Sequence, residues 1–105
     1  MEGSDVSSQE NRSPSGVTVV LPHQLREQAG GRRSVTVSPG TVREIVRALD
    51  QECPGMVFRL CYETGEMRPY VNVFVASESI KYLQGLDTPV SDGAEVSILP
   101  AVAGG

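Results

Sequence analysis

The chain has 105 residues, enough for one domain with a single hydrophobic core. Hydrophobic residues make up 39% of it and charged residues 21%, as in an ordinary globular protein. The formal net charge is −4 and the nine basic residues are scattered, which argues against nucleic acid as the main partner. There is neither an apolar run long enough to span a bilayer nor a signal-peptide core, so we expect a cytoplasmic protein without membrane contact.

The residues that commonly bind metals are few. Cys53 and Cys61 do not form a Cys-x-x-Cys pair, and His23 is the single histidine. A zinc site needs more ligands than these, so we expect no metal and no bound cofactor. In a cytoplasmic protein a disulfide is also disfavoured, so both cysteines are interpreted as ordinary half-buried thiols.

The first sixteen residues are rich in Ser, Glu, Asn and Gly. Such a segment cannot bury enough apolar surface to offset the entropy lost on ordering. We therefore predict a disordered tail over residues 1–16, followed by a folded domain over 17–99 and a flexible tail over 100–105.

Two strands are expected first in the folded part. Alternating aliphatic residues predict a strand from Val17 to Leu21, which Pro22 ends. A second alternating segment covers 34–38 and is ended by Pro39-Gly40. We expect these two strands to pair as a hairpin with a long loop, in which Leu25 is an apolar anchor.

A helix is expected next, because Thr41-Val42-Arg43-Glu44 has the pattern of a capping box. Four aliphatic residues then fall on one helical face, which predicts packing onto the sheet: Val42, Ile45, Val46 and Leu49. Pro54-Gly55 predicts that the helix ends near residues 51–53.

The middle of the chain is less regular. Met56, Phe58 and Leu60 are expected to cover one end of the core, and Thr64-Gly65 predicts a turn. Residues 70–76 are apolar on both faces and β-branched, which is typical of a central strand. Phe74 points away from the neighbouring valines, where it meets either a partner or a nearby loop.

The last third completes the sheet. Residues 80–86 predict a short strand or turn, Asp92-Gly93 predicts a turn, and 94–99 predict the last strand. Pro100 lacks an N–H donor and marks where the chain leaves the sheet. The element order predicts an α+β roll, a mixed sheet of four to five strands with one main helix across one face.

The chain ends in Ala101-Val102-Ala103-Gly104-Gly105. Two terminal glycines have no Cβ, so they can enter a narrow channel and adopt dihedrals closed to other residues. The only reactive group at the tip is the α-carboxylate of Gly105. The pattern predicts a protein whose own C-terminus carries its chemistry, although small residues also end many chains without a function.

The element order and the tail resemble the ubiquitin-like β-grasp sulfur carriers of the ThiS/MoaD type. The resemblance covers residues 17–105, and its most specific segments are 39–44, 71–75, 91–93 and 99–105. The final Leu-Pro-Ala-Val-Ala-Gly-Gly is most similar to the actinobacterial carriers that serve cysteine synthesis. Molybdopterin-synthase subunits more often have a second proline where this chain has Ala101.

The resemblance implies that this chain is a carrier and not an enzyme, and that it is a monomer when free. An enzyme similar to ubiquitin-activating (E1) enzymes would adenylate the Gly105 carboxylate with ATP, and sulfide or a persulfide would convert it to a thiocarboxylate. Gly104 would permit close approach in the enzyme's channel, Ala101, Val102 and Ala103 would form the arm, and Pro100 would set its direction.

In the cysteine branch the resemblance implies two further partners. A pyridoxal-phosphate (PLP) synthase would receive the sulfur, and a zinc peptidase of the JAMM type would release the product. ATP, PLP and zinc would then belong to the partners.

Three alternatives remain open at this stage. The chain could be the small subunit of a molybdopterin synthase, a ubiquitin-like protein modifier joined to targets through Gly105, or an interaction module whose glycines are incidental.

Overall fold

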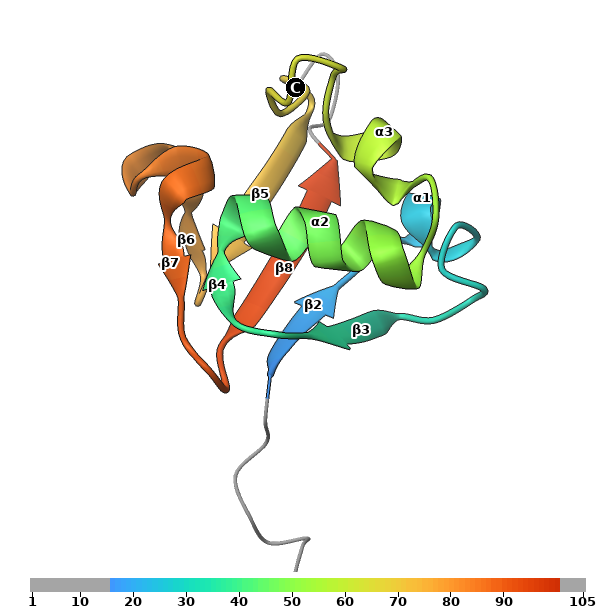
Figure 1. Cartoon of the computed structure of the whole chain (residues 1–105), viewed down its shortest axis with the longest axis horizontal. Helices are drawn as coiled ribbons and strands as arrows, with labels where there is room; N and C mark the ends of the chain where they lie inside the picture. Colours follow the sequence, from blue (N-terminus) through green and yellow to red (C-terminus); the bar gives the residue numbers. More distant parts are fainter. Residues whose placement is uncertain (1–15, 101–105) are drawn as a thin grey trace, which may run out of the picture.

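The computed structural model describes residues 16–100, and its centre is a five-stranded mixed sheet (Figure 1). The order across the sheet is β3-β2-β8-β5-β6. The strands have these bounds: β2 Val17–Val20, β3 Ser34–Val37, β5 Val71–Val75, β6 Glu78–Ser79 and β8 Glu95–Pro100. β8 lies in the middle, parallel to β2 and antiparallel to β5.

The predicted hairpin is confirmed. β2 and β3 are antiparallel, with Val17 opposite Val37 and Val19 opposite Val35. The loop between them contains one helical turn that the sequence analysis did not predict, α1 (His23–Arg26). Leu25 on this turn is buried, so the anchor expected there is confirmed.

The main helix, α2 (Val42–Glu52), begins with the predicted capping box. The Glu44 N–H donates to the Thr41 hydroxyl at 3.2 Å, and the Thr41 N–H donates to the Glu44 carboxylate at 2.9 Å. The helix lies across one face of the sheet (Figure 1). Its four predicted core residues are all buried, namely Val42, Ile45, Val46 and Leu49.

A second helix, α3 (Met56–Leu60), occupies a segment to which the sequence analysis assigned no helix. Asp50 favours its start, because one oxygen of its carboxylate accepts the Gly55 and Val57 N–H groups at 3.0 Å each. Met56 and Leu60 are buried as predicted, but the expectation for Phe58 was wrong, since its side chain is 62% exposed. On a helix, residues four apart, such as Met56 and Leu60, share a face. Phe58 is midway between them and therefore lies on the other side.

The segment after β5 was predicted only as a short strand or turn. It contains the two-residue strand β6 and two 3-10 helices, η1 (Ile80–Tyr82) and η2 (Gly85–Asp87). A small second sheet, β4 (Gly40–Thr41) paired with β7 (Pro89–Val90), was not predicted. It ties the start of α2 to the last part of the chain, where the Val42 N–H donates to the Thr88 carbonyl at 2.9 Å.

One continuous core fills the space between the sheet and α2. Its largest fully buried members come from β2, α2, α3, β8 and the residues that follow β2 and α2: Val17, Val19, Leu21, Val42, Ile45, Leu49, Cys53, Met56, Leu60 and Val96. This confirms the predicted fold class, an α+β β-grasp fold with a mixed sheet and one main helix. None of the helices in the described part is long and apolar enough to cross a membrane.

Candidate functional site

The candidate site is the end of the sheet where β8 leads to the C-terminal residues. β8 is bonded on both sides, and Val19 lies opposite Val96 on one flank while Val73 lies opposite Ile98 on the other. The predicted arm and carrier residues, Ala101 to Gly105, lie outside the described residues. The structure therefore positions the base of the tail, at the end of the central strand.

Pro100 is still part of this strand. The register places it opposite Val71, one residue beyond the predicted strand end at Leu99. A proline removes only its own N–H from the ladder, so it can occupy the final position of a strand. The six-residue strand is Glu95–Pro100.

Exposed apolar side chains gather at this end of the sheet. Six large hydrophobic residues are exposed in the described part of the chain, and four of them come from α3, the segment after it, and the strand ends. These four are Phe58, Tyr62, Tyr70 and Leu99, with Tyr70 51% and Leu99 47% exposed. Figure 1 shows α3 and the segment after it beside the tip of β8.

A hollow of about 220 Å³ lies among these residues. Its walls come from α1, α3, β5 and β8, and they are mostly apolar: Pro22, Leu25, Leu60, Tyr70, Val71, Ile98 and Leu99, with Gln24 and Arg59. Arg59 is the one charged residue among those nine. We define Phe58, Arg59, Tyr70 and Leu99 as the exit collar, because they surround the point where β8 ends.

The same end carries a second guanidinium group. Arg68 lies with its guanidinium carbon 4.7 Å from the centre of the Tyr62 ring, and its Nε donates to the Phe58 carbonyl at 3.0 Å. The hydrogen bond holds the segment after α3 against that helix, and the ring contact joins two residues within the segment. Sequence analysis missed these residues because α3 was not predicted; a helical pattern over 56–60 separates buried Met56 and Leu60 from exposed Phe58 and Arg59.

Phe74, the residue proposed from sequence as a partner contact, lies elsewhere. It is in β5 opposite Ser97 and Ser79, and its neighbours Val71 and Val73 are the buried residues of that strand. Phe74 is partly exposed. Since strand residues rise about 3.3 Å each, Phe74 is about 10 Å along β5 from the Val71–Pro100 pair.

The cysteines and the histidine do not form a site. Cys53 and Cys61 are free and buried, so the expectation of half-burial was too low. Burial raises the pKa of the Cys61 thiol, and the nearby Arg68 and Arg43 guanidinium groups only partly oppose that rise. His23 is exposed on α1. Within residues 16–100 no three His, Cys, Asp or Glu side chains are grouped as metal ligands would be.

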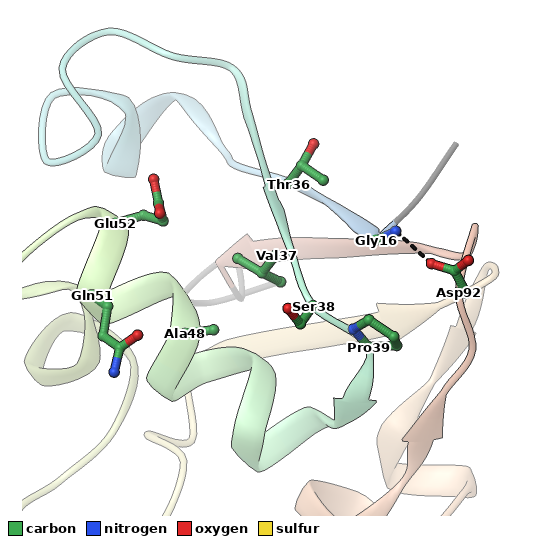
Figure 2. A pocket seen from close by; sticks show the side chains of 9 residues that line it. All are labelled: Gly16, Thr36, Val37, Ser38, Pro39, Ala48, Gln51, Glu52 and Asp92. Atoms are coloured by element: carbon green, nitrogen blue, oxygen red, sulfur yellow. Dashed lines mark hydrogen bonds between the residues drawn. The ribbon is translucent and has the colours of Figure 1, made fainter. Parts of the chain in front are cut away.

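A wider groove of about 440 Å³ lies between β3 and α2, at the other end of β8 (Figure 2). Val37, Pro39 and Ala48 form its apolar part, and Gln51 and Glu52 its polar part. Asp92, from the turn before β8, accepts the Gly16 N–H there. The groove is polar and open, and its lining contains neither a histidine nor a cysteine, so no nucleophile–base pair is formed by the residues drawn.

Known proteins are similar to this chain in sequence and in fold. The sequence model of the ThiS family matches residues 19–105. The sulfur carrier protein CysO of Mycobacterium tuberculosis is 38% identical over 91 residues, which is 85% of this chain and 98% of that protein. CysO in the crystal structure of the Amycolatopsis orientalis BexX/CysO complex is 39% identical with a TM-score of 0.79, covering 85% of this chain and 99% of that one.

A second group of similar structures consists of small archaeal modifier proteins. The small archaeal modifier protein 1 from Methanosarcina acetivorans is 28% identical with a TM-score of 0.75, and the match covers 87% of this chain and 97% of that one. The family match extends through the last residue and includes nearly all of the folded part. The chain therefore belongs to the ThiS family, a group with the β-grasp fold described above.

Proposed function

We propose that this chain is a sulfur carrier protein whose Gly105 carboxylate is converted to a thiocarboxylate. The observation that carries the proposal is the Gly104-Gly105 pair, which three residues separate from the central strand of a ThiS-family domain. CysO of Mycobacterium tuberculosis, which is 38% identical over 85% of this chain, is named a sulfur carrier protein.

The first step activates the carboxylate, which is a poor electrophile because its negative charge repels nucleophiles. A partner enzyme similar to E1 enzymes supplies ATP, and a carboxylate oxygen of Gly105 attacks the α-phosphorus. The bond to pyrophosphate breaks, and an acyl-adenylate forms at Gly105. The carbonyl carbon now has AMP as a good leaving group.

The second step introduces sulfur. Hydrosulfide attacks the carbonyl carbon, AMP leaves with the electron pair of the broken C–O bond, and loss of a proton gives the thiocarboxylate without any change in oxidation state. If a persulfide is the donor, the product is an acyl disulfide, and a thiol must reduce its S–S bond to release the same thiocarboxylate.

The third step delivers the sulfur. The thiocarboxylate is ionised at neutral pH and polarisable, so it attacks an electrophilic carbon held by a second enzyme. The C-terminal string Leu99–Gly105 supports the cysteine branch, in which that enzyme is a PLP-dependent synthase. The cysteine adduct on Gly105 is then released by hydrolysis of the bond to Gly105, a reaction suited to a JAMM-type zinc peptidase. ATP, PLP and zinc are bound by these partners, and the chain itself is a co-substrate, not a catalyst.

The chain's own residues contribute position and access. β8 fixes the base of the tail, because β5 pairs with it as far as Pro100, where the strand ends. Ala101, Val102 and Ala103 add length with small side chains, and Gly104 lets the enzyme's channel close around the backbone. Because β5 pairs with β8 as far as Pro100, a partner enzyme does not have to order the base of the tail when it binds.

Intact mass spectrometry of the chain purified from its native host tests the proposal, with the C-terminal peptide sequenced. A fraction with one sulfur in place of one oxygen on Gly105, or with a cysteine adduct there, is the expected result. An unmodified carboxylate, also after incubation with ATP, sulfide and host extract, would contradict the proposal.

A protein-modifier role is the second candidate, favoured by the match to small archaeal modifier proteins. The same acyl-adenylate at Gly105 would then react with a lysine amine on a target, forming an isopeptide bond. Tagged chain expressed in the host should give conjugates of higher mass if this occurs. A Gly105 deletion variant is the control, because it cannot form them.

A further inference from the structure

β3 forms one edge of the sheet, and within residues 16–100 no strand pairs with its outer side (Figure 1). We propose that this edge binds the β3 edge of a second copy of the chain, so that two five-stranded sheets join into one across a two-fold axis. The dimer replaces the free monomer that the resemblance implied. It is independent of the proposed function, because β2 separates β3 from the strand that leads to the tail.

The first argument is the direction of the backbone groups of β3. In an antiparallel pair, successive residues direct their N–H and C=O groups alternately toward the neighbouring strand and away from it. The Leu21 N–H donates to the Arg33 carbonyl at 2.8 Å, so every second residue from Arg33 onward bonds with β2. Ser34 and Thr36 therefore direct their N–H and C=O groups outward from the sheet, and both residues are exposed.

The second argument is that β3 lacks the features by which proteins usually block pairing at a sheet edge, namely short length, charged side chains and proline. The opposite edge, β6, has two residues and includes Glu78. β3 has four residues, and its two exposed side chains, Ser34 and Thr36, are small and uncharged. An edge of this kind presents a row of hydrogen-bonding groups to another chain.

The alternation also determines which residues face each other across the two-fold axis. Because Ser34 and Thr36 carry the outward groups, the axis passes beside Val35, and Ser34 of each copy exchanges two hydrogen bonds with Thr36 of the other. Arg33 then lies opposite Val37 of the second copy. The same residues contribute on both sides, so the assembly closes at two copies.

The third argument is charge, which favours this antiparallel register. Asp92 and Val37 line the β3–α2 groove at the end where Gly16 lies (Figure 2). The register therefore brings the Arg33 guanidinium of one copy toward the Asp92 carboxylate of the other, at two symmetric places. Both side chains are exposed, and within residues 16–100 neither forms an ion pair. One oxygen of Asp92 accepts the Gly16 N–H, so the other is available to the second copy.

The interface leaves both tails accessible. β3 lies two strand positions from β8, a separation of about 10 Å across the sheet. β2 is parallel to β8 and antiparallel to β3, so in the dimer the two β8 strands run in opposite directions and lead to opposite ends of the joined sheet. Each copy can therefore present its C-terminus to an enzyme while the two copies stay paired.

Analytical ultracentrifugation of the full chain tests the association. Pairing of two four-residue strands buries little surface, so a Kd on the order of 100 µM is expected. Sedimentation equilibrium, from about tenfold below to about tenfold above that concentration, should show the average mass rising from 11.2 kDa toward twice that value. Thr36→Pro removes an outward N–H and no bond to β2, so it should raise the Kd at least about tenfold. Thr36→Val keeps the N–H and is the control, with an unchanged Kd.

A charge exchange tests the register. Arg33→Glu and Asp92→Lys should each raise the Kd at least about tenfold, because a like-charge pair replaces an attraction at both symmetric places. The double variant, which combines the two substitutions, should recover most of the association. Arg47→Glu makes the same charge change on the exposed face of α2 and should have no effect. Failure of the double variant to recover would overturn the register on which the proposal depends. Thermal unfolding verifies that each variant is folded.

Amide hydrogen exchange distinguishes this dimer from other ways of covering the edge. Protection of the Ser34 and Thr36 amides should increase with protein concentration, whereas the Val35 amide is already bonded to β2 and should change little. Protection that does not depend on concentration would mean that the edge is covered within one chain, and would overturn the proposal. A mass that stays at 11.2 kDa over the whole range, or an association that Thr36→Pro leaves unchanged, would overturn it too.

Discussion

The two ends of β8 differ in surface character although the same strand connects them. Where β8 begins, the groove between β3 and α2 is open and polar, and its charged lining residues, Glu52 and Asp92, are acidic. Where β8 ends, exposed aromatic residues and arginines surround a mostly apolar hollow. Of these two hollows, the larger is thus at the end away from the tail on which the proposed function rests. The chemistry and apolar exposure at the tail base are more informative.

The largest expected effect is at the tail. Under the proposed function, Gly104→Val adds a branched side chain inside the partner's channel, so adenylation should fall about a hundredfold or more. The midpoint of thermal unfolding should not change, because Gly104 comes four positions after the end of β8. ATP–pyrophosphate exchange measures the first quantity and circular dichroism the second. Normal adenylation of the variant would remove the argument for a narrow channel.

A substitution in the core should lower the stability of the whole fold, and therefore of both ends of β8. Leu49 on α2 is fully buried, and Leu49→Ala should lower the free energy of unfolding by about 3 kcal/mol through lost burial and a residual cavity. Urea denaturation gives this value. Below the unfolding transition the variant should still be adenylated at the wild-type rate. A selective loss of adenylation would show that packing around Leu49 affects the tail.

The start of α2 provides a smaller test. Thr41→Ala removes the hydroxyl that accepts the Glu44 N–H, and should cost about 1 kcal/mol of stability. Thr41→Ser is the matched control, since it keeps the hydroxyl and should recover most of the loss. Chemical denaturation compares the three proteins. Equal stability of the alanine and serine variants would mean that the capping box contributes little here.

Cys61 predicts a specific dependence on pH. Burial raises the pKa of its thiol from its usual value near 9.0, so above that pH the folded state keeps a proton that the unfolded state has lost. The stabilising contribution is therefore complete below about pH 9 and decreases as the pH rises toward the folded-state value. Between pH 8 and about 10, stability should fall more steeply in the wild type than in Cys61→Ala. Parallel slopes would contradict this assignment.

The smallest effect is expected in the groove. Glu52 and Arg32 form an ion pair of 3.8 Å with both side chains about half exposed, so Glu52→Gln should change stability by less than about 0.5 kcal/mol. Adenylation should also be unchanged. Exchange kinetics and urea denaturation measure both quantities. A clear loss of adenylation would show that the β3–α2 groove, and not only the tail end, contacts the activating enzyme.

Local patterns predicted much of the fold. The alternation in β2 and β3, the capping box at Thr41 and the helical spacing from Val42 to Leu49 depend on neighbours within a few residues, and each was confirmed. Helix α3 and the β4–β7 pair were missed. Both are short. The β4–β7 pair is stabilised across the fold, where the Val42 N–H donates to the Thr88 carbonyl, and α3 by the burial of Met56 and Leu60 in the core.

The candidate site divides in the same way. The Gly-Gly terminus and the family-like string before it are properties of covalent order, so the sequence by itself determined that Gly105 is the carrier candidate. The collar is different, because Arg59, Tyr70 and Leu99 are separated by up to forty positions and meet only when β8 pairs with β5 and α3 folds beside them. Tertiary structure alone decided this, since strand pairing and helix packing bring together residues that no local pattern connects.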